Sequence, residues 1–397
     1  MAIDGGAPVR NEFMPFGVPS ITDDEINEVV DTLKSGWIGT GHKAQRFEHE
    51  FARYTGADHA VAVSSCTAAL HLALLALDCG PGDEVVTSDL TFVATTNAIL
   101  HSGATPVVAD VDATTWNVTA ETLAAACSPR TKALLPVHFG GLACELDAIY
   151  DFADEHGIAV VEDCAHAVGT ERRGRRLGST PGVSCFSFYA NKNLTTSEGG
   201  MLTTPAEDLA ARIVTWRLHG LDQDAWHRFQ TTELLRSWCT YPGFKYNLTD
   251  LAASLGIHQL ARLDTMLEQR ESLATQLDPV VDSLPGASRQ PRPTDRSEGR
   301  HGLHLYAITI DPSAFTVDRD HVVQALRAEN IGAAIHYEPV HRHPYYEQLL
   351  GVGDADRPVA SAVGSTILSL PLTPAMSPAD LDDVANALER VLVHYRR

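Results

Sequence analysis

The chain has 397 residues, of which 44% are hydrophobic and 20% charged, which is typical of a globular protein. Its net charge is −21, and no cluster of lysine and arginine is present that could follow a phosphate backbone, so nucleic acid is excluded as an expected partner. No run of about eighteen apolar residues occurs, so we expect no membrane partner. Seven scattered cysteines without a Cys-x-x-Cys pair favour free thiols in a reducing, cytoplasmic compartment and argue against a metal site.

Helical spacing of apolar residues predicts two helices near the start of the chain, over 21–35 and about 44–55. From residue 59 onwards, short apolar strands alternate with helices. Such alternation indicates βαβ units and a mostly parallel sheet covered on both faces. The predicted strands are 59–63, 84–87, 106–109, 133–137, 158–161, 183–188 and 200–203.

The pattern changes after residue 250. A long helical stretch over 251–281 could bridge two domains, and a polar loop over 288–302 follows it. We therefore expect a large α/β domain over 1–250 and a small α+β domain over 251–397. The elements predicted for the second domain are a strand over 303–310, a helix over 318–329 with Asp318 as its N-cap, and a closing helix over 380–395.

Ligands of open α/β sheets bind outside the carboxyl ends of the strands. Four segments whose residues could bind a ligand or take part in a reaction lie there. SSCTA, Ser64 to Ala68, lies between a strand and a helix, where N–H groups and hydroxyls suit a phosphate or serve as simple caps. It is not a Walker loop, and the absence of a Gly-x-Gly-x-x-Gly motif argues against a dinucleotide oxidoreductase. DLTF, Asp89 to Phe92, places an aromatic side chain at the second junction, either in the core or stacked on a flat ligand.

The third segment is VVEDCAHA, where Glu162 and Asp163 follow a buried strand. Two carboxylates in that position are costly unless they are paired or used. Two interpretations stay open. Either Asp163 caps the next turn and Glu162 is solvated, or Asp163 holds a cationic partner inside a site.

The fourth segment is SFYANKNLTTSEGG, Ser187 to Gly200, which contains Lys192, one of only five lysines. A desolvated amine among small residues and hydroxyls can lose its proton and become a nucleophile. The closing glycine pair is expected to let the backbone pass close to a cofactor. Together the four segments suit a ligand with a phosphate, a flat ring, an aldehyde that reacts with a lysine, and a ring atom that needs a carboxylate partner. This combination predicts pyridoxal 5′-phosphate.

The order of motifs resembles that of the DegT/StrS family of nucleotide-sugar aminotransferases over nearly the whole chain. The resemblance implies the α/β fold-type I of pyridoxal-phosphate transferases, with a large, mostly parallel sheet domain and a smaller C-terminal α+β domain. GFKYNLTDL with Asp-Cys-Ala-His is most similar to the branch that aminates C4 of UDP- or dTDP-4-keto sugars. The motifs are VSSCTAALHLAL, DLTFVATTNAI, PVHFGG, VVEDCAHAVGT, SFYANKNLTTSEGG and GFKYNLTDLAA.

The resemblance also implies roles for single residues. Lys192 stands at the Schiff-base position, and Asp163 at the position of the partner to the pyridine nitrogen. The GFKYN segment of the family reaches the cofactor of the partner subunit, which implies a homodimer with shared active sites. The remaining implied contacts are Thr67, Ala68 and Ser187 to the phosphate, Phe92 and His166 to the ring, Lys245 and Asn247 to the partner's cofactor, and His336 to the sugar.

We therefore expect an aminotransferase that moves an amino group from L-glutamate to a keto-sugar nucleotide through a Lys192 Schiff base. The opening GGAPVR resembles cyclitol and aminoshikimate-type aminotransferases of the same family, so a scyllo-inosose-type acceptor in antibiotic biosynthesis remains open. Cys66 and Ser197 depart from the family, since many relatives have glycine there.

Two further readings are disfavoured. The related sugar 3-dehydratases have histidine at the position of Lys192. A pyridoxal-phosphate-binding regulator without catalysis is disfavoured because Asp163, Lys192 and Ser187 are all intact.

Overall fold

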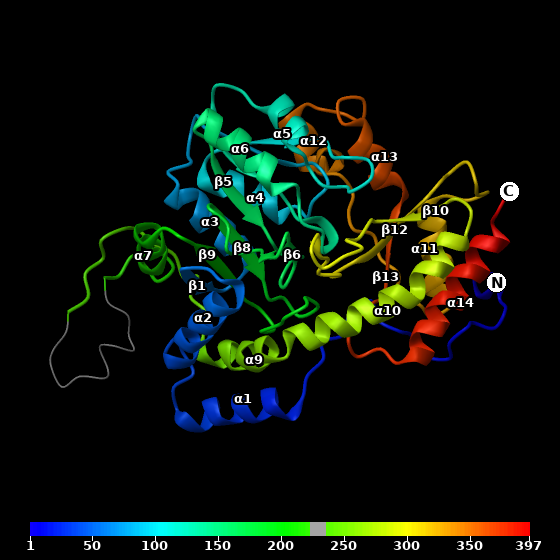
Figure 1. Ribbon diagram of the computed structural model, residues 1–397, viewed down its shortest axis with the longest axis horizontal. Coiled ribbons are helices and arrows are strands. Elements are labelled where there is room, and N and C mark those ends of the chain that lie inside the picture. Colours follow the sequence, from blue (N-terminus) through cyan, green and yellow to red (C-terminus); the bar gives the residue numbers. More distant parts are fainter. Residues whose placement is uncertain (223–235) are drawn as a thin grey trace.

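The computed structural model describes residues 1–222 and 236–397 (Figure 1). A seven-stranded sheet with the order β1-β9-β8-β5-β4-β2-β3 runs through the larger part of the molecule. Every neighbouring pair is parallel except the two pairs that β9 makes with β1 and β8. The predicted α/β class is therefore confirmed. The strands are β1 (His59–Val63), β2 (Glu84–Ser88), β3 (Thr105–Ala109), β4 (Thr131–Leu135), β5 (Ala159–Asp163), β8 (Val183–Ser187) and β9 (Gly200–Thr204).

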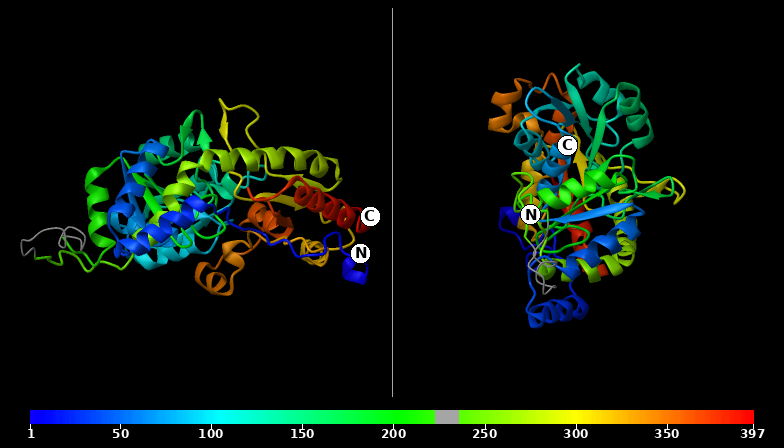
Figure 2. Two further views of the ribbon diagram at one scale, coloured as in Figure 1. Left: turned by 90° about the horizontal axis from the view of Figure 1, so that it is seen from below. Right: turned by 90° about the vertical axis from the view of Figure 1, so that its left-hand side faces the viewer.

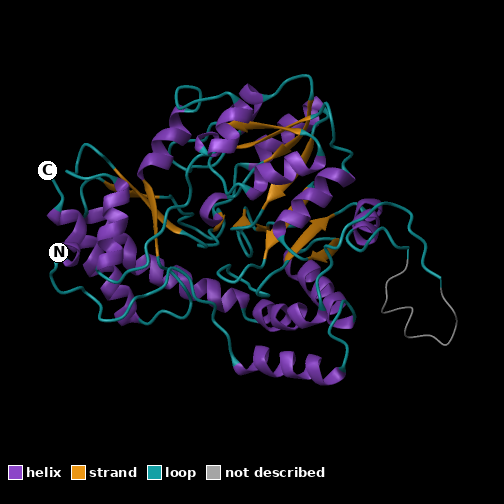
Figure 3. Cartoon of the chain, turned by 180° about the vertical axis from the view of Figure 1, so that it is seen from behind, coloured by secondary structure: helices purple, strands orange, loops and turns teal. Residues whose placement is uncertain are grey.

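The two faces of this sheet bury alternate residues of the same strands, because successive side chains point to opposite sides. Val61 and Val161 belong to the core under α3, α4 and α7, whereas Ala62 and Val160 belong to the core under α2, α6 and α9. Figure 3 shows helices on both sides of these strands. The helices are α1 (Asp23–Ser35), α2 (His42–Thr55), α3 (Cys66–Ala76), α4 (Ala94–Ser102), α5 (Ala120–Ala126), α6 (Leu146–His156), α7 (Glu207–Trp216) and α9 (Asp250–Ala261).

A second core lies between an antiparallel sheet of order β10-β12-β13 and the helices α10, α11 and α14. Both chain termini lie at this end of the elongated molecule (Figure 2). A third, short sheet has the order β11-β6-β7. The elements are α10 (Leu263–Ser283), β10 (Ala287–Arg289), β11 (Gly299–Arg300), β12 (Tyr306–Ile310), α11 (Arg319–Ala328), α12 (Pro344–Leu350), α13 (Pro358–Thr366), β13 (Ile367–Leu370), α14 (Pro378–His394), β6 (Glu171–Arg172) and β7 (Arg175–Arg176).

The helical stretch expected over 251–281 is interrupted at Arg262, which separates α9 from α10. α9 packs with the large sheet, whereas α10 continues to the second core (Figure 1). Met14, from the start of the chain, also joins the second core. The division into domains at residue 250 stays a proposal. Within the described ranges, no helix is both long and apolar enough to cross a membrane.

One buried carboxylate fixes the start of α2 against α9. Asp250 is fully buried and accepts hydrogen bonds from the backbone N–H groups of Gly41 at 2.7 Å, Ala44 at 2.9 Å and Lys43 at 3.2 Å. A helix N-terminus has unpaired N–H groups and a positive dipole end, so a carboxylate there is stabilising. Asp250 therefore caps α2 from another helix and also holds the loop before it.

We expect Asp250→Ala to lower the free energy of unfolding by about 2–4 kcal/mol, because it leaves buried N–H groups without an acceptor. Thermal and urea unfolding of the purified protein measure the change. Asp382→Ala is the matched control, since Asp382 is exposed on α14 and its loss should change stability by less than about 0.5 kcal/mol. Equal unfolding midpoints for the two variants would contradict the capping role.

Candidate active site

A cavity of about 450 Å³ opens where the strands of the large sheet end. β1, β2, β5 and β8 run in one direction, so the loops that follow them meet at the same edge. The cavity brings together predicted residues from segments that are far apart in the sequence. These residues are Thr67, Phe92, Asp163, His166, Ser187, Lys192 and His336.

The start of α3 forms one wall of the cavity. Thr67 lines it, together with Ser187 at the end of β8. The first N–H groups of a helix have no partner within the helix, which suits an anion at this wall. Ala68 is different, because it is buried outside the cavity lining and its N–H donates to Oγ of the N-cap Ser65 at 3.1 Å.

Asp163 ends β5 as a buried carboxylate on the cavity wall. It accepts hydrogen bonds from Oγ1 of Thr95 at 2.8 Å and from the N–H of Ala165 at 3.0 Å. Burial raises the pKa of Asp163, and these two donors and the positive charge of Lys192 oppose that rise. A charged partner facing the cavity would therefore be needed to stabilise the ionised form fully.

The position of Glu162 contradicts one of the two interpretations that the sequence left open, in which Asp163 is a cap and Glu162 is solvated. It is fully buried, accepts a hydrogen bond from the hydroxyl of Tyr150 at 2.6 Å and lies 2.9 Å from Nε2 of His138. The expectation of a solvated Glu162 is therefore wrong. Side chains alternate along β5, so Glu162 points away from Asp163 and is satisfied by other partners.

The glycine pair at the end of SFYANKNLTTSEGG also allows a close contact between two backbone segments, and its expected closeness to a cofactor stays a prediction. A Cβ on Gly200 would lie 2.5 Å from the carbonyl carbon of Ser65 and 2.7 Å from the nitrogen of Cys66. Gly200 thus lets β9 pass against the backbone at the start of α3, and Gly199 lines the cavity beside it. Ser197 has φ +70°, a left-handed conformation that explains why glycine suits this position.

Lys192 points its amine into the cavity from the loop after β8. Its Nζ lies 3.2 Å from Nε2 of His304. Burial lowers the pKa of Lys192 to about 8, although the charges of Cys66 and Asp163 act in the opposite direction. Compared with an exposed lysine, this increases the fraction of free amine at neutral pH by roughly two orders of magnitude.

His166 also lines the cavity, as a neutral imidazole whose ring centroid lies 4.5 Å from that of His304. Burial and the charge of Lys192 lower its pKa well below the ordinary value. Its Nδ1 accepts from the N–H of Gly140 at 3.3 Å, so the proton is on Nε2, which faces the hydroxyl of Tyr337 at 3.0 Å. The rings of His166 and Tyr337 are stacked with their centroids 5.8 Å apart.

Phe92 and His336 also line the cavity. Phe92 is 56% exposed, so it is not the core residue that the sequence also allowed. Its ring lies 5.7 Å from that of Tyr337. His336 lies 3.0 Å, through Nδ1, from the hydroxyl of Ser369, and burial with the charge of Lys192 lowers its pKa to about 4.

Lys245 and Asn247 are not brought to this cavity. They line another hollow of about 460 Å³ with Trp37 and Ile38, and Nδ2 of Asn247 donates to Oγ1 of Thr40 at 2.6 Å. This separation agrees with the prediction that the two residues serve a neighbouring subunit, and that role stays a prediction.

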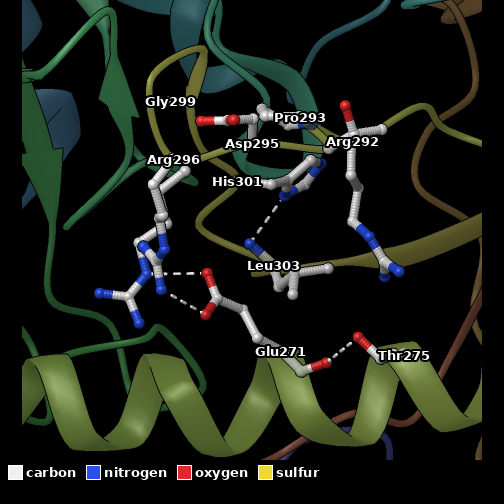
Figure 4. A pocket seen from close by; sticks show the side chains of 11 residues that line it. Glu271, Thr275, Arg292, Pro293, Asp295, Arg296, Gly299, His301 and Leu303 are labelled. Atoms are coloured by element: carbon white, nitrogen blue, oxygen red, sulfur yellow. Dashed lines mark hydrogen bonds and ion pairs between the residues drawn. The ribbon is translucent and has the colours of Figure 1, made fainter.

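Figure 4 shows a further hollow of about 240 Å³ between α10 and the loop after β10. Arg296 and Arg300 pair with Glu271, and Arg292 pairs with Asp278. Because these cations are matched by carboxylates, the hollow offers little excess charge to an anion.

Among the residues of the main cavity that sequence reasoning missed are three whose side chains contact Asp163, His166 or Lys192: Thr95, Tyr337 and His304. Thr95 follows Phe92 by three positions on α4, and Tyr337 follows His336 directly, so both lay within segments already singled out. His304 lies just before β12, where the sequence showed only the alternation of a strand. The presence of a histidine in an otherwise apolar, strand-like segment was the one feature of the sequence that could have marked His304 as a site residue.

The chain is similar to known proteins over nearly its whole length. The model of the DegT/DnrJ/EryC1/StrS aminotransferase family matches residues 19–389. The spore coat polysaccharide biosynthesis protein SpsC of Bacillus subtilis is 48% identical over 384 residues, which are 96% of this chain and 98% of that protein.

Two solved structures extend the comparison to the fold. "Putative sugar aminotransferase Spr1654" of Streptococcus pneumoniae, in its PMP-form, has a TM-score of 0.89 at 31% identity and covers 96% of this chain and 99% of its own. The aminotransferase TlmJ of Streptoalloteichus hindustanus has a TM-score of 0.87 at 32% identity, with the same coverage of both chains. The chain belongs to the DegT/DnrJ/EryC1/StrS aminotransferase family.

Proposed function

We propose that the protein transfers an amino group from L-glutamate to C4 of a UDP- or dTDP-linked 4-keto sugar. The observation that carries this proposal is the buried amine of Lys192, which shares one cavity with the buried carboxylate of Asp163 and the exposed ring of Phe92. The names of SpsC and Spr1654, which refer to polysaccharide biosynthesis and a sugar aminotransferase, support a sugar as acceptor.

Pyridoxal 5′-phosphate is the cofactor of this enzyme family. The residues of the cavity fit it, because they include the buried amine of Lys192, the buried carboxylate of Asp163, the exposed ring of Phe92 and hydroxyl groups next to a helix N-terminus. When bound, the cofactor supplies an electron sink for breaking the Cα–H bond of the amino donor. The side chains of the protein would bind and orient the reactants and move the protons.

Lys192 has two tasks in this proposal. It attaches the cofactor covalently through Nζ in the resting enzyme, and as a free amine it moves a proton between the donor and the cofactor as a general acid–base. The lowered pKa of Lys192, about 8, suits both tasks near neutral pH. An ordinary lysine would be almost wholly protonated there.

Asp163 would hold the ring nitrogen of the cofactor and keep a proton on it. Its hydrogen bonds to Thr95 and Ala165 fix the carboxylate in one orientation. A cationic ring nitrogen in a dry site would lower the pKa of Asp163, which burial raises. The fixed orientation of the Asp163 carboxylate and the positive charge of the ring nitrogen would thus both stabilise the ionised form of Asp163.

The remaining predicted residues are assigned to binding. Thr67, Ser187 and the start of α3 would bind the phosphate, Phe92 would cover one face of the ring, and His336 would face the sugar; Thr67, Ser187, Phe92 and His336 all line the cavity. We assign Lys245 and Asn247 to the active site of a partner subunit, which makes the enzyme a homodimer with shared sites. Ala68 contributes through the backbone of α3, whose first turn it closes.

The position of GGAPVR bears on the acceptor. Arg10 pairs with Asp380 and Asp383 of α14, and the N–H of Val9 donates to Glu329. This segment therefore packs against the second core, and none of its residues lines the described cavity. Its resemblance to cyclitol aminotransferases thus concerns residues remote from the acceptor, which favours the keto-sugar.

We expect Lys192→Ala to abolish the adduct that borohydride fixes between the cofactor and the chain, and to lower transamination by roughly 10²–10⁴-fold or more. Mass spectrometry of the reduced protein and the visible absorbance measure the first effect. Lys132→Ala, at an exposed lysine, is the control and should keep the adduct. A cofactor still reduced onto the Lys192→Ala chain would disprove the attachment site.

Asp163→Asn keeps the shape of the side chain but removes its charge. We expect it to retain the cofactor while the rate of transamination falls by roughly 10²–10³-fold, because a preorganised charge at the ring nitrogen is lost. Stopped-flow absorbance with L-glutamate separates binding from turnover. Glu162→Gln is the neighbouring control, where we expect lower stability and a half-reaction rate close to that of the parent. Undiminished turnover in Asp163→Asn would remove its electronic role.

The acceptor is tested with a panel of ketones. With L-glutamate as donor, we expect 2-oxoglutarate to form with UDP- or dTDP-4-keto sugars and not with scyllo-inosose. Chromatography and mass spectrometry of the products identify the aminated compound. Turnover of the cyclitol alone would overturn the proposed acceptor and leave the transamination chemistry intact.

A further inference from the structure

His304 contacts Lys192 but has no role in the function proposed above. It lines the cavity at 6% exposure, and its Nε2 lies 3.2 Å from Nζ of Lys192. Its other ring nitrogen, Nδ1, is buried and has no hydrogen-bond partner among the residues that the structure describes. Buried polar atoms are rarely left unpaired in native proteins, so this arrangement needs a reason.

The backbone just before His304 is held in an unfavourable conformation. Leu303 has φ +49°, which is left-handed and strained for a residue with a branched side chain. The N–H of Leu303 donates to Nδ1 of His301 at 2.8 Å (Figure 4), and its carbonyl accepts from Arg270 at 3.0 Å. Strained residues persist where their surroundings fix them, and they cluster at functional sites.

A second set of contacts ties this segment to the loop of Lys192. Nδ2 of Asn193 donates to the carbonyl of Gly302 at 2.5 Å. The N–H of Gly302 donates in turn to the carbonyl of Gly141 at 2.8 Å. Because Asn193 follows Lys192 directly, the two loops are fixed relative to each other, and so are the imidazole and the amine.

The charges around the pair define which hydrogen bond forms. Burial and the charge of Lys192 lower the pKa of His304 well below its ordinary value, so the imidazole is neutral. An ammonium group has donors only, so Nε2 accepts from protonated Lys192, and that contact stabilises the protonated form. The titratable and charged groups that face this pair are His166, His336, Asp163, Cys66 and Arg270.

We propose that His304 is a positioning residue that holds the ε-amine of Lys192 over the cavity whenever this amine is not covalently engaged. The proposal rests on the proposed function for the identity of the reaction, whereas the contact belongs to the chain alone. His304 acts through Lys192: it restricts Nζ to one side of the cavity and sets how readily the amine gives up its proton.

Competitive labelling of the full-length, cofactor-free protein with acetic anhydride tests this over a range of pH. The chain has five lysines, so the Lys192 peptide is resolved by mass spectrometry, and exposed Lys132 is the internal standard. We expect half-maximal labelling of Lys192 near pH 8 in the parent. In His304→Phe, which keeps the site dry and removes the acceptor, we expect the midpoint about one pH unit lower.

Two variants control this result. His304→Asn keeps an acceptor oxygen and should shift the midpoint less. His321→Phe makes the same exchange on α11, where His321 pairs with Tyr395, and should leave the midpoint of Lys192 unchanged. If circular dichroism shows that His304→Phe is unfolded, His304→Leu replaces it with the same expected shift.

An unchanged or higher midpoint in the folded variant would overturn the role of His304. Because labelling uses neither cofactor nor keto-sugar, that result would leave the proposed function standing. Conversely, failure of every acceptor in the ketone panel would overturn the proposed function and leave a shifted midpoint as evidence for the contact.

Discussion

The buried carboxylate of Asp163 is the constraint on which the rest of the site depends. Removing a carboxylate from water is costly unless hydrogen bonds and a cation compensate for the loss. The chain supplies two donors from different segments, Thr95 on α4 and Ala165 after β5, so β2, β5 and their connections must be placed together. The parallel sheet provides this placement, since the ends of its strands lie at one edge.

The same edge also explains the glycine at the start of β9. β9 runs antiparallel to its neighbours, so its first residue lies where their last residues lie. Gly200 can enter that crowded edge because it has no Cβ to meet Ser65 and Cys66. Contacts within the chain therefore pack three elements against each other: the start of α3, the end of β8 and the loop of Lys192.

Much of this could be predicted from the sequence because its signals are local. Short apolar runs marked the strands of the large sheet, and the segments around Asp163 and Lys192 carried their chemistry within a few residues. The order of such segments in a βαβ pattern also predicts that they meet at one edge. The positions of Phe92, His166 and Ser187 on the cavity wall follow from the same reasoning.

The remaining features depend on contacts between distant parts of the chain. His304 reaches Lys192 across 112 positions, and the conformation of Leu303 that makes this possible is set by Arg270 and His301. Whether Glu162 is solvated or buried depends on Tyr150 and on α6 covering that face of the sheet. Local pattern carries no information on such pairings, which arise only when separate elements pack.

The pKa values of two buried lysines, Lys43 and Lys192, are shifted in opposite directions, and this affects which amine reacts with an aldehyde. An aldehyde is a general electrophile that condenses with any accessible unprotonated amine. Lys43 is withdrawn from that reaction, since ion pairs with Glu28 and Asp31 raise its pKa despite its burial. Lys192 has the opposite shift. Differences in protonation, as well as the shape of the cavity, therefore favour Lys192 over Lys43 as the amine that reacts with such a reagent.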